Sequence, residues 1–170
     1  MFSWSAPGSQ VVIISAMSAD RVIGRGDGMP WDVPQEYQHF LDTTRDATLV
    51  LGRRSYEIFG PTLTSARCFV VTRHPDRFTP SPNATSDGIA VSSLDEAVDR
   101  AREFDAHIYV AGGGQIYQQA IDTADGMLLS VIPGDWSGET YFPSFAADAW
   151  HVLLTEDRGG YQLTQYERRR

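Results

Sequence analysis

Short apolar segments alternate with amphipathic segments along most of this chain, and this alternation restricts its fold more than any other sequence feature. The apolar segments are rich in Val and Ile, which favour strands buried on both faces. Such strands are expected at 11–17, 48–51, 67–72, 89–91, 108–111 and 127–132. Helices are expected between them, at 34–44, 53–59, 93–103 and 114–121. This order predicts an α/β fold with a mostly parallel central sheet of about eight strands, flanked by helices.

The end of the chain departs from the alternation. Two extended segments, 151–156 and 161–167, are separated by Gly159-Gly160, which is typical of a hairpin turn. We therefore expect an antiparallel C-terminal hairpin at one edge of the sheet. Three other segments lie outside the predicted elements: an N-terminal extension at 1–10, a variable loop rich in Pro and Ser at 74–87, and a solvated tail at 168–170. With 170 residues and no internal repeat, the chain is expected to form one domain, 1–170.

The charge and cysteine content exclude several functions. The net charge is −8, which disfavours a general grip on nucleic acid. All 14 basic residues are Arg, so chemistry that needs a Lys, such as a Schiff base or a P-loop, is excluded. The single Cys68 and four scattered His residues do not form a metal-binding pattern, so no metal is expected. No segment reads as a secretory signal or a bilayer span, which predicts a cytoplasmic protein without membrane contact.

A glycine-rich segment leads into the first predicted helix. Residues 24–31 run through Met29, Pro30 and Trp31 toward a helix that begins near Pro34. Glu36 and Phe40 are four residues apart and share one helix face. A carboxylate beside an aromatic ring suits a flat heterocycle that carries N–H donors. From its position alone, Glu36 also fits an exposed residue of a surface helix.

Arginine and glycine follow the predicted strand ends, where open α/β sheets bind ligands. Arg53 and Arg54 come directly after the strand that ends near Gly52, and Arg73 follows the next strand. Three guanidinium groups at neighbouring strand ends suit a phosphate, although each alone also fits a solvated side chain. The run 112–114 is all glycine, which permits close backbone approach to a ligand but lacks the spaced Rossmann pattern. Residues 138–143 have turn character and are expected to brace a neighbouring loop.

Together these segments and their order resemble the dihydrofolate reductase family. The match runs from about residue 11 to 166 and rests on four motifs: Val-Ile-Gly with Met-Pro-Trp, Gly-Arg-Arg-Ser-Tyr-Glu, Gly-Gly-Gly-Gln-Ile-Tyr, and Gly-Glu-Thr-Tyr-Phe-Pro. The resemblance implies a monomeric enzyme that uses NADPH. It also implies hydride transfer to C6 of a 7,8-dihydropterin and protonation at N5. It leaves open whether that proton comes through Glu36 or through a water that the loop admits.

The resemblance also implies individual roles. It places Glu36 on the pterin 2-amino group and N3, with Ser130 supporting it from just after a strand. It places Met29 in a mobile loop and Trp31 beside a bound water. The other substrate contacts that it implies are Ile14, Ser15, Phe40, Phe59 and Leu63. The cofactor contacts that it implies are Ala16, Ile23, Gly24, Gly52, Arg53, Arg54, Ser55, Thr72, Arg73, Gly113, Gly114, Gln115, Ile116, Tyr117 and Thr140.

One departure from the family pattern bears on the substrate. Family members usually carry an Arg that holds the glutamate tail, and Ala66 stands at that position here. Arg67 is one residue later, and in a strand its side chain points to the other face. The chain therefore fits a reductase of dihydrofolate, or a reductase of a dihydropterin without that glutamate, such as dihydromethanopterin. The same fold also suits a reductase of riboflavin synthesis, which Met-Pro-Trp followed by Glu36 disfavours, and a non-catalytic nucleotide-binding module.

Overall fold

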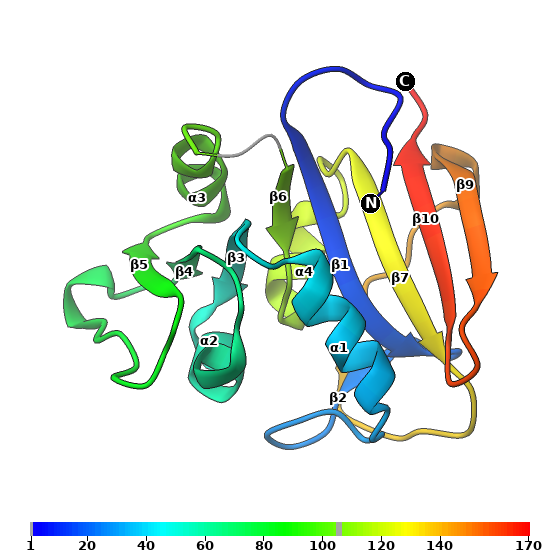
Figure 1. The fold of residues 1–170 in the computed structure, drawn as a ribbon, viewed down its shortest axis with the longest axis horizontal. Helices are drawn as coiled ribbons and strands as arrows, with labels where there is room; N and C mark the ends of the chain where they lie inside the picture. Colours follow the sequence, from blue (N-terminus) through cyan, green and yellow to red (C-terminus); the bar gives the residue numbers. More distant parts are fainter. Residues whose placement is uncertain (1, 105–106) are drawn as a thin grey trace.

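The computed structural model describes residues 2–104 and 107–170, and one eight-stranded sheet runs through this part of the chain (Figure 1). Its strand order is β5-β4-β3-β6-β1-β7-β10-β9. The strands are β1 (Gln10–Ser18), β3 (Thr48–Gly52), β4 (Arg67–Val71), β5 (Asp87–Val91), β6 (His107–Val110), β7 (Gly126–Ile132), β9 (Trp150–Asp157) and β10 (Gln162–Arg168). In this order, each strand from β5 across to β7 is parallel to its neighbours, whereas β10 is antiparallel to both β7 and β9. The predicted parallel sheet with an antiparallel C-terminal hairpin is confirmed.

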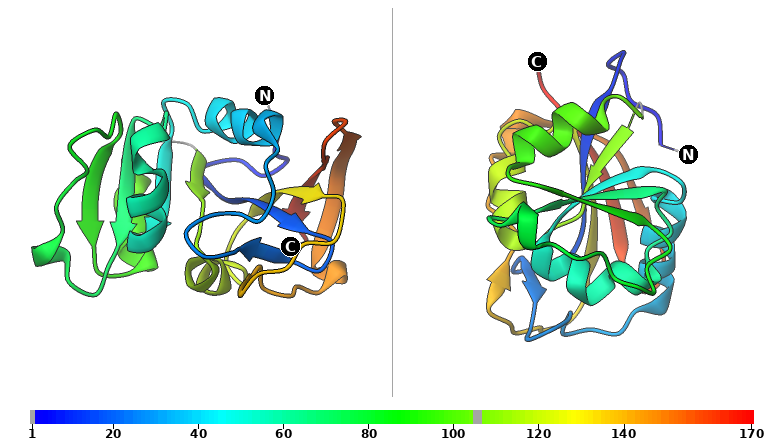
Figure 2. Two further views of the ribbon diagram at one scale, coloured as in Figure 1. Left: turned by 90° about the horizontal axis from the view of Figure 1, so that it is seen from below. Right: turned by 90° about the vertical axis from the view of Figure 1, so that its left-hand side faces the viewer.

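Helices cover both faces of the sheet, as predicted. The described residues include four α-helices: α1 (Pro34–Thr43), α2 (Arg53–Phe59), α3 (Leu94–Ala101) and α4 (Gly114–Ala120). Helices α3 and α4 contribute to one buried apolar cluster, and α1 and α2 pack against a second. Figure 2 shows α1 and α4 on opposite sides of β1 and β7. Short 3-10 turns lie at η1 (Gly60–Thr62), η2 (Pro75–Arg77) and η3 (Ala147–Ala149). No helix among the described residues is long and apolar enough to cross a bilayer.

Several local predictions are corrected. Strands β2 (Val22–Gly24) and β8 (Thr140–Tyr141) form a small separate sheet inside segments expected to be loop or turn. They are too short to show an apolar period. Ser130 lies inside β7, not after it, because β7 stays paired with β1 as far as Ile132. The predicted loop 74–87 contains the η2 turn and the first residue of β5.

The predicted solvated tail is wrong for Arg168. Its Nε donates to the Ala124 carbonyl at 2.6 Å and its Nη2 to the Ile121 carbonyl at 2.6 Å. Its guanidinium also lies 4.3 Å from the centroid of the Trp150 ring. Carbonyls just past the end of a helix lack partners within the helix and attract a cation. Arg168 thereby ties the last strand to the end of α4.

The segment before β1 packs on the last strand. The Ser5 amide donates to Glu167 Oε1 at 2.6 Å, and Gln165 Nε2 donates to the Ser3 carbonyl at 2.8 Å. Strand β1 begins at Gln10, within the segment predicted as an extension, and residue 1 of that segment lies outside the described residues.

Candidate active site

A buried carboxylate lies on α1, on the side that faces the sheet. Glu36 is only 5% exposed and hydrogen-bonds with the Ser130 hydroxyl of β7. Burial raises the pKa of Glu36 to about 7, and the Ser130 hydrogen bond acts in the opposite direction. An exposed position on a surface helix, which the sequence alone also fits, is therefore wrong. Close to neutral pH this carboxyl group can hold a proton or accept hydrogen bonds as a carboxylate.

Apolar and aromatic groups surround this carboxylate. Ile14, Trp31 and Leu63 belong to the buried cluster on this face of the sheet, and Phe40 and Phe59 pack against it. The predicted substrate residues are thus brought together, with Ser15 beside them on β1. Trp31 lies edge-on to Trp136, with ring centroids 6.1 Å apart.

The indole nitrogen of Trp31 is among a few buried side-chain polar atoms of the described residues that lack a hydrogen-bond partner. Trp31 Nε1 is buried and has no hydrogen-bond partner in the described structure. Buried donors are normally satisfied by protein or by water. The position therefore suits a bound water or a polar group of a ligand.

A cleft of about 980 Å³ opens along the carboxyl ends of β1, β3, β4 and β6. All the residues predicted to contact the cofactor line it, together with Ser15, Met29 and Phe59 from the other predicted sets. Glu36, Ser130, Trp31, Ile14, Phe40 and Leu63 do not line this cleft. They lie in the layer behind it: Ser130 is the register partner of Ala16, and the Tyr117 hydroxyl donates to the Ile14 carbonyl at 2.7 Å. The open, glycine-lined cleft therefore adjoins a buried, largely apolar layer that contains Glu36.

Glycines allow two strand-end turns to approach each other. The Gly52 amide donates to the Gly112 carbonyl at 2.8 Å, so the turns after β3 and β6 are in direct contact. Gly112 has φ +111°, a conformation that side-chain-bearing residues rarely adopt. A Cβ on Gly114 would lie 3.0 Å from Thr140 Cγ2. Backbone rather than side chains therefore forms this wall of the cleft.

The three predicted phosphate-binding arginines all face the same cleft. Arg53 Nη1 lies 2.7 Å from Glu57 Oε1, and Arg54 Nη2 lies 3.1 Å from Asp27 Oδ1. These pairs are more than half exposed and contribute little to stability, so an anionic ligand can displace the carboxylates at low cost.

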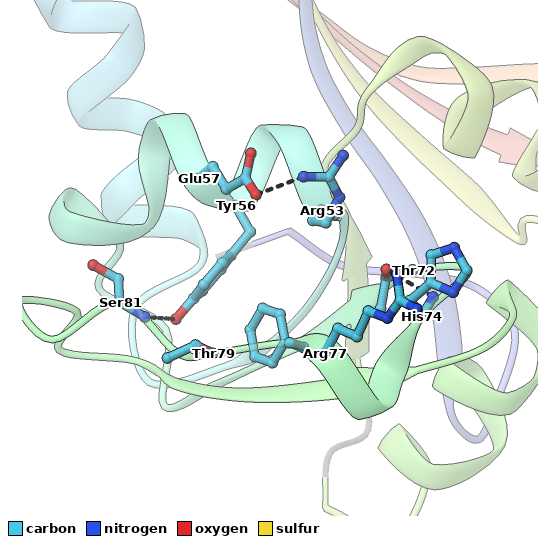
Figure 3. Close-up of a pocket in the computed structure, with 9 residues that line it drawn as sticks. Arg53, Tyr56, Glu57, Thr72, His74, Arg77, Thr79 and Ser81 are labelled. Carbon is cyan, nitrogen blue, oxygen red and sulfur yellow. Dashed lines mark hydrogen bonds and ion pairs between the residues drawn. The ribbon is translucent and has the colours of Figure 1, made fainter.

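A second cavity of about 540 Å³ adjoins the cleft (Figure 3). It shares Arg53, Thr72 and His74 with the cleft and adds Arg77 of the η2 turn. Figure 3 shows the Arg77 side chain extending toward Thr72 and His74. Sequence reasoning missed His74 and Arg77. The sequence feature that could have indicated them is their position soon after Arg73, at the start of the predicted variable loop.

The 138–143 segment braces the glycine-rich loop, as predicted. Strand β8 pairs with β2, the Gly26 amide donates to a Glu139 carboxylate oxygen, and Arg21 Nη1 donates to the Phe142 carbonyl at 2.7 Å. This loop carries Gly24, Gly26 and Gly28 into the cleft wall. Within the described part of the chain, no group of three or more His, Cys, Asp or Glu residues could hold a metal ion.

Comparisons with known proteins agree with this arrangement. A family model described as dihydrofolate reductase matches residues 10–168. The type A13 dihydrofolate reductase of Escherichia coli is 30% identical over 164 residues, which cover 94% of this chain and 95% of that protein. Dihydrofolate reductase HdrB of Haloferax volcanii is 30% identical over 163 residues, which cover 93% of this chain and 83% of that protein.

A solved structure also matches the fold. It is a dihydrofolate reductase from Enterococcus faecalis complexed with NADP(H) and RAB-propyl, with a TM-score of 0.80. At 24% identity it covers 95% of this chain and 97% of that one, and it bears on the fold alone. Because the family model spans nearly the whole chain and two relatives of 30% identity each cover more than nine-tenths of it, the chain belongs to the dihydrofolate reductase family.

Proposed function

We propose that this protein catalyses the NADPH-dependent reduction of 7,8-dihydrofolate to 5,6,7,8-tetrahydrofolate. The single observation that carries the proposal is Glu36, a buried carboxylate with a pKa of about 7, behind a glycine-lined cleft in a member of this family. The curated relatives are named dihydrofolate reductases, and the solved neighbour is named as a complex with NADP(H).

The residues of the open cleft fit a phosphorylated dinucleotide. Gly112, Gly113 and Gly114 form a wall that a side chain would fill, which leaves backbone groups for the pyrophosphate. Arg53 and Arg73 stand at adjacent strand ends, where guanidinium groups suit the ribose 2′-phosphate. NADPH, when bound, supplies the hydride. The chain's own contribution is to hold it along the strand ends, beside the buried layer that contains Glu36.

We assign two tasks to the buried Glu36. As a carboxylate it accepts hydrogen bonds from the ring N–H donors of a dihydropterin, and its partner Ser130 orients it. With its pKa near 7 it also holds a proton in the pH range in which N5 must be protonated. The unpartnered Trp31 Nε1 offers a donor for a water between the carboxyl group and the substrate. Phe40 and Phe59 supply apolar surface for the flat ring, and Met29 borders the cleft.

We also propose that the protein acts as a monomer in the cytoplasm. The net charge of −8 favours molecules that repel one another and stay separate in solution. The binding of a small molecule requires no partner chain.

The test is steady-state kinetics with Glu36→Gln. The substitution keeps the size of the side chain and removes the ionisable proton. We expect kcat with dihydrofolate to fall by about 10²- to 10⁴-fold, the usual range for a lost general acid. NADPH binding, measured by fluorescence quenching, should stay close to that of the wild type. Glu103→Gln, an exposed carboxylate away from the cleft, is the matched control. Full activity of Glu36→Gln would overturn the assignment of Glu36. Tight NADPH binding by a wild type that reduces no dihydropterin would favour the non-catalytic module.

A further inference from the structure

The second cavity, of about 540 Å³, has a cationic end and an aromatic end. It is lined by α2 and by the segment that follows β4, as far as Ser81. Figure 3 shows Thr72, His74 and the end of the Arg77 side chain together on one side, with the Tyr56 ring on the other. A cavity of this size accommodates a small molecule and not only a single ion.

The cationic end contains hydrogen-bond donors that find no acceptor in the protein. Thr72 is 8% exposed, and its hydroxyl oxygen accepts the His74 amide at 3.2 Å. The hydroxyl proton of Thr72 has no acceptor among the described residues, and the side chains of His74 and Arg77 have no partner there either. Buried donors are normally satisfied, and a guanidinium beside a hydroxyl suits an anion.

One acidic residue among the described residues lines this cavity. Glu57 Oε1 lies 2.7 Å from Arg53 Nη1, and both side chains are more than half exposed. An exposed pair of this kind is held weakly, so an arriving anion can take the place of Glu57 on Arg53. Arg53 and Arg77 together then face the anion.

The aromatic end offers flat apolar surface. Tyr56 is 1% exposed, and the centroid of its ring lies 5.4 Å from that of the Phe78 ring. The Ser81 amide donates to the Tyr56 hydroxyl at 3.3 Å, which fixes the segment after Phe78 against α2. An aromatic ring that enters the cavity can pack against this surface.

The cavity borders the proposed cofactor cleft without being part of it. Arg53, Thr72 and His74 line both the cavity and the cleft. Arg77 lines only the cavity, whereas Arg73 lines only the cleft. A ligand in the cavity would therefore engage Arg53 and Thr72, which the cofactor also approaches.

We propose that this cavity binds a small aromatic phosphate monoester, and that its occupancy weakens NADPH binding because both ligands compete for Arg53. The phosphate lies between Arg53 and Arg77 and accepts the Thr72 proton, and the ring packs on Phe78 and Tyr56. The binding of the phosphate ester stands on the cavity alone, whereas its effect on NADPH rests on the proposed function. By linkage, NADPH weakens the binding of the ester by the same factor.

The first experiment follows the amide NMR shifts of the ligand-free protein during titration with phenyl phosphate. The Kd should be on the order of 1 mM, as for other ligands of this size. Inorganic phosphate and phenol each lack one half of the ligand and should bind at least about tenfold more weakly. The amides of 74–81 should shift more than those of 112–114.

The second experiment compares two single variants on either side of the shared boundary. Arg77→Ala should weaken phenyl phosphate binding by about 10-fold and leave the Kd of NADPH close to that of the wild type. Arg73→Ala is the matched control and should do the reverse. Arg77→Lys keeps the charge and should retain most of the phenyl phosphate binding. Saturating phenyl phosphate should raise the Kd of NADPH by about three- to tenfold in the wild type, and much less in Arg77→Ala.

The inference is overturned if phenyl phosphate does not bind, or if Arg77→Ala binds it as tightly as the wild type. It is also overturned if Arg77→Ala weakens NADPH binding as much as Arg73→Ala does, because the cavity would then belong to the cofactor site. An unchanged Kd of NADPH in saturating phenyl phosphate would overturn the competition for Arg53. The proposed function fails separately, when the wild type reduces no dihydrofolate, and the NMR titration does not depend on that reaction.

Discussion

The buried carboxyl group of Glu36 should make the stability of the ligand-free protein depend on pH in a specific way. Its pKa rises from 4.5 to about 7 on folding, chiefly because burial penalises the charged form. The folded state therefore binds the proton more tightly than the unfolded state. The stabilisation is fully present below pH 4.5 and is lost as the pH rises through 7. The full difference is on the order of 3 kcal/mol.

The assay compares the wild type with Glu36→Gln, so that other titrating groups cancel. Urea unfolding at pH values from 5 to 9, without ligands, gives the free energy of unfolding of each protein. The variant has no proton to lose at this position. Its stability relative to the wild type should therefore increase by about 2–3 kcal/mol between pH 5 and pH 9. Parallel stability curves across this range would refute the argument that Glu36 is buried with a raised pKa. Glu103→Gln shows what removal of an exposed carboxylate does in the same assay.

Three further outcomes are expected. Arg73→Ala should weaken NADPH binding by roughly 10-fold and NADH binding much less, because only NADPH carries the 2′-phosphate. Equal losses of affinity for the two cofactors, measured by fluorescence titration, would rule out a contact between Arg73 and that phosphate. Burial lowers the pKa of His39 to about 4, so the neutral imidazole stabilises the folded protein above pH 6.5 and this stabilisation is lost as the pH falls through 4. Between these pH values the free energy of unfolding of His39→Gln should therefore fall less than that of the wild type. Identical acid unfolding curves for the two proteins would contradict this. Arg168→Met should lower the free energy of unfolding by about 1–3 kcal/mol, because the Ala124 and Ile121 carbonyls lose their donor. Arg170→Met changes an exposed arginine and is the control. Equal urea midpoints for the two variants would contradict the docking of Arg168.

The long elements of the fold could be predicted from the sequence because their signals are local. Strands such as β1 and β7 are runs of β-branched and apolar residues, and Pro34 marks the start of α1. Strands β2 and β8 could not be predicted, because they are three and two residues long and exist through pairing with each other. Ser130 lies within the strand predicted at 127–132; only its position just after a strand, which the resemblance implied, is corrected by the pairing of β7 with β1.

Some parts of the candidate site could be predicted from the sequence and others could not. The difference is again whether the interacting residues are close together in the sequence. The residues predicted to contact the cofactor follow glycine-marked strand ends, so their convergence on one cleft follows from the topology. The burial of Glu36, by contrast, depends on how α1 lies against the sheet, which helix periodicity does not state. The second cavity combines residues of α2 with residues of the segment after β4 and has no sequence signature. The docking of Arg168 depends on carbonyls more than 40 positions away in the chain.

The most direct test of the account is the oxidation of NADPH by the purified wild type in the presence of 7,8-dihydrofolate, with the product identified by chromatography. We predict that NADPH is consumed and tetrahydrofolate is formed in equal amounts, and that Glu36→Gln loses most of this activity. NADPH binding without consumption, at saturating dihydrofolate and across the pH range around 7, would contradict the assignment of this chain as a dihydrofolate-reducing enzyme.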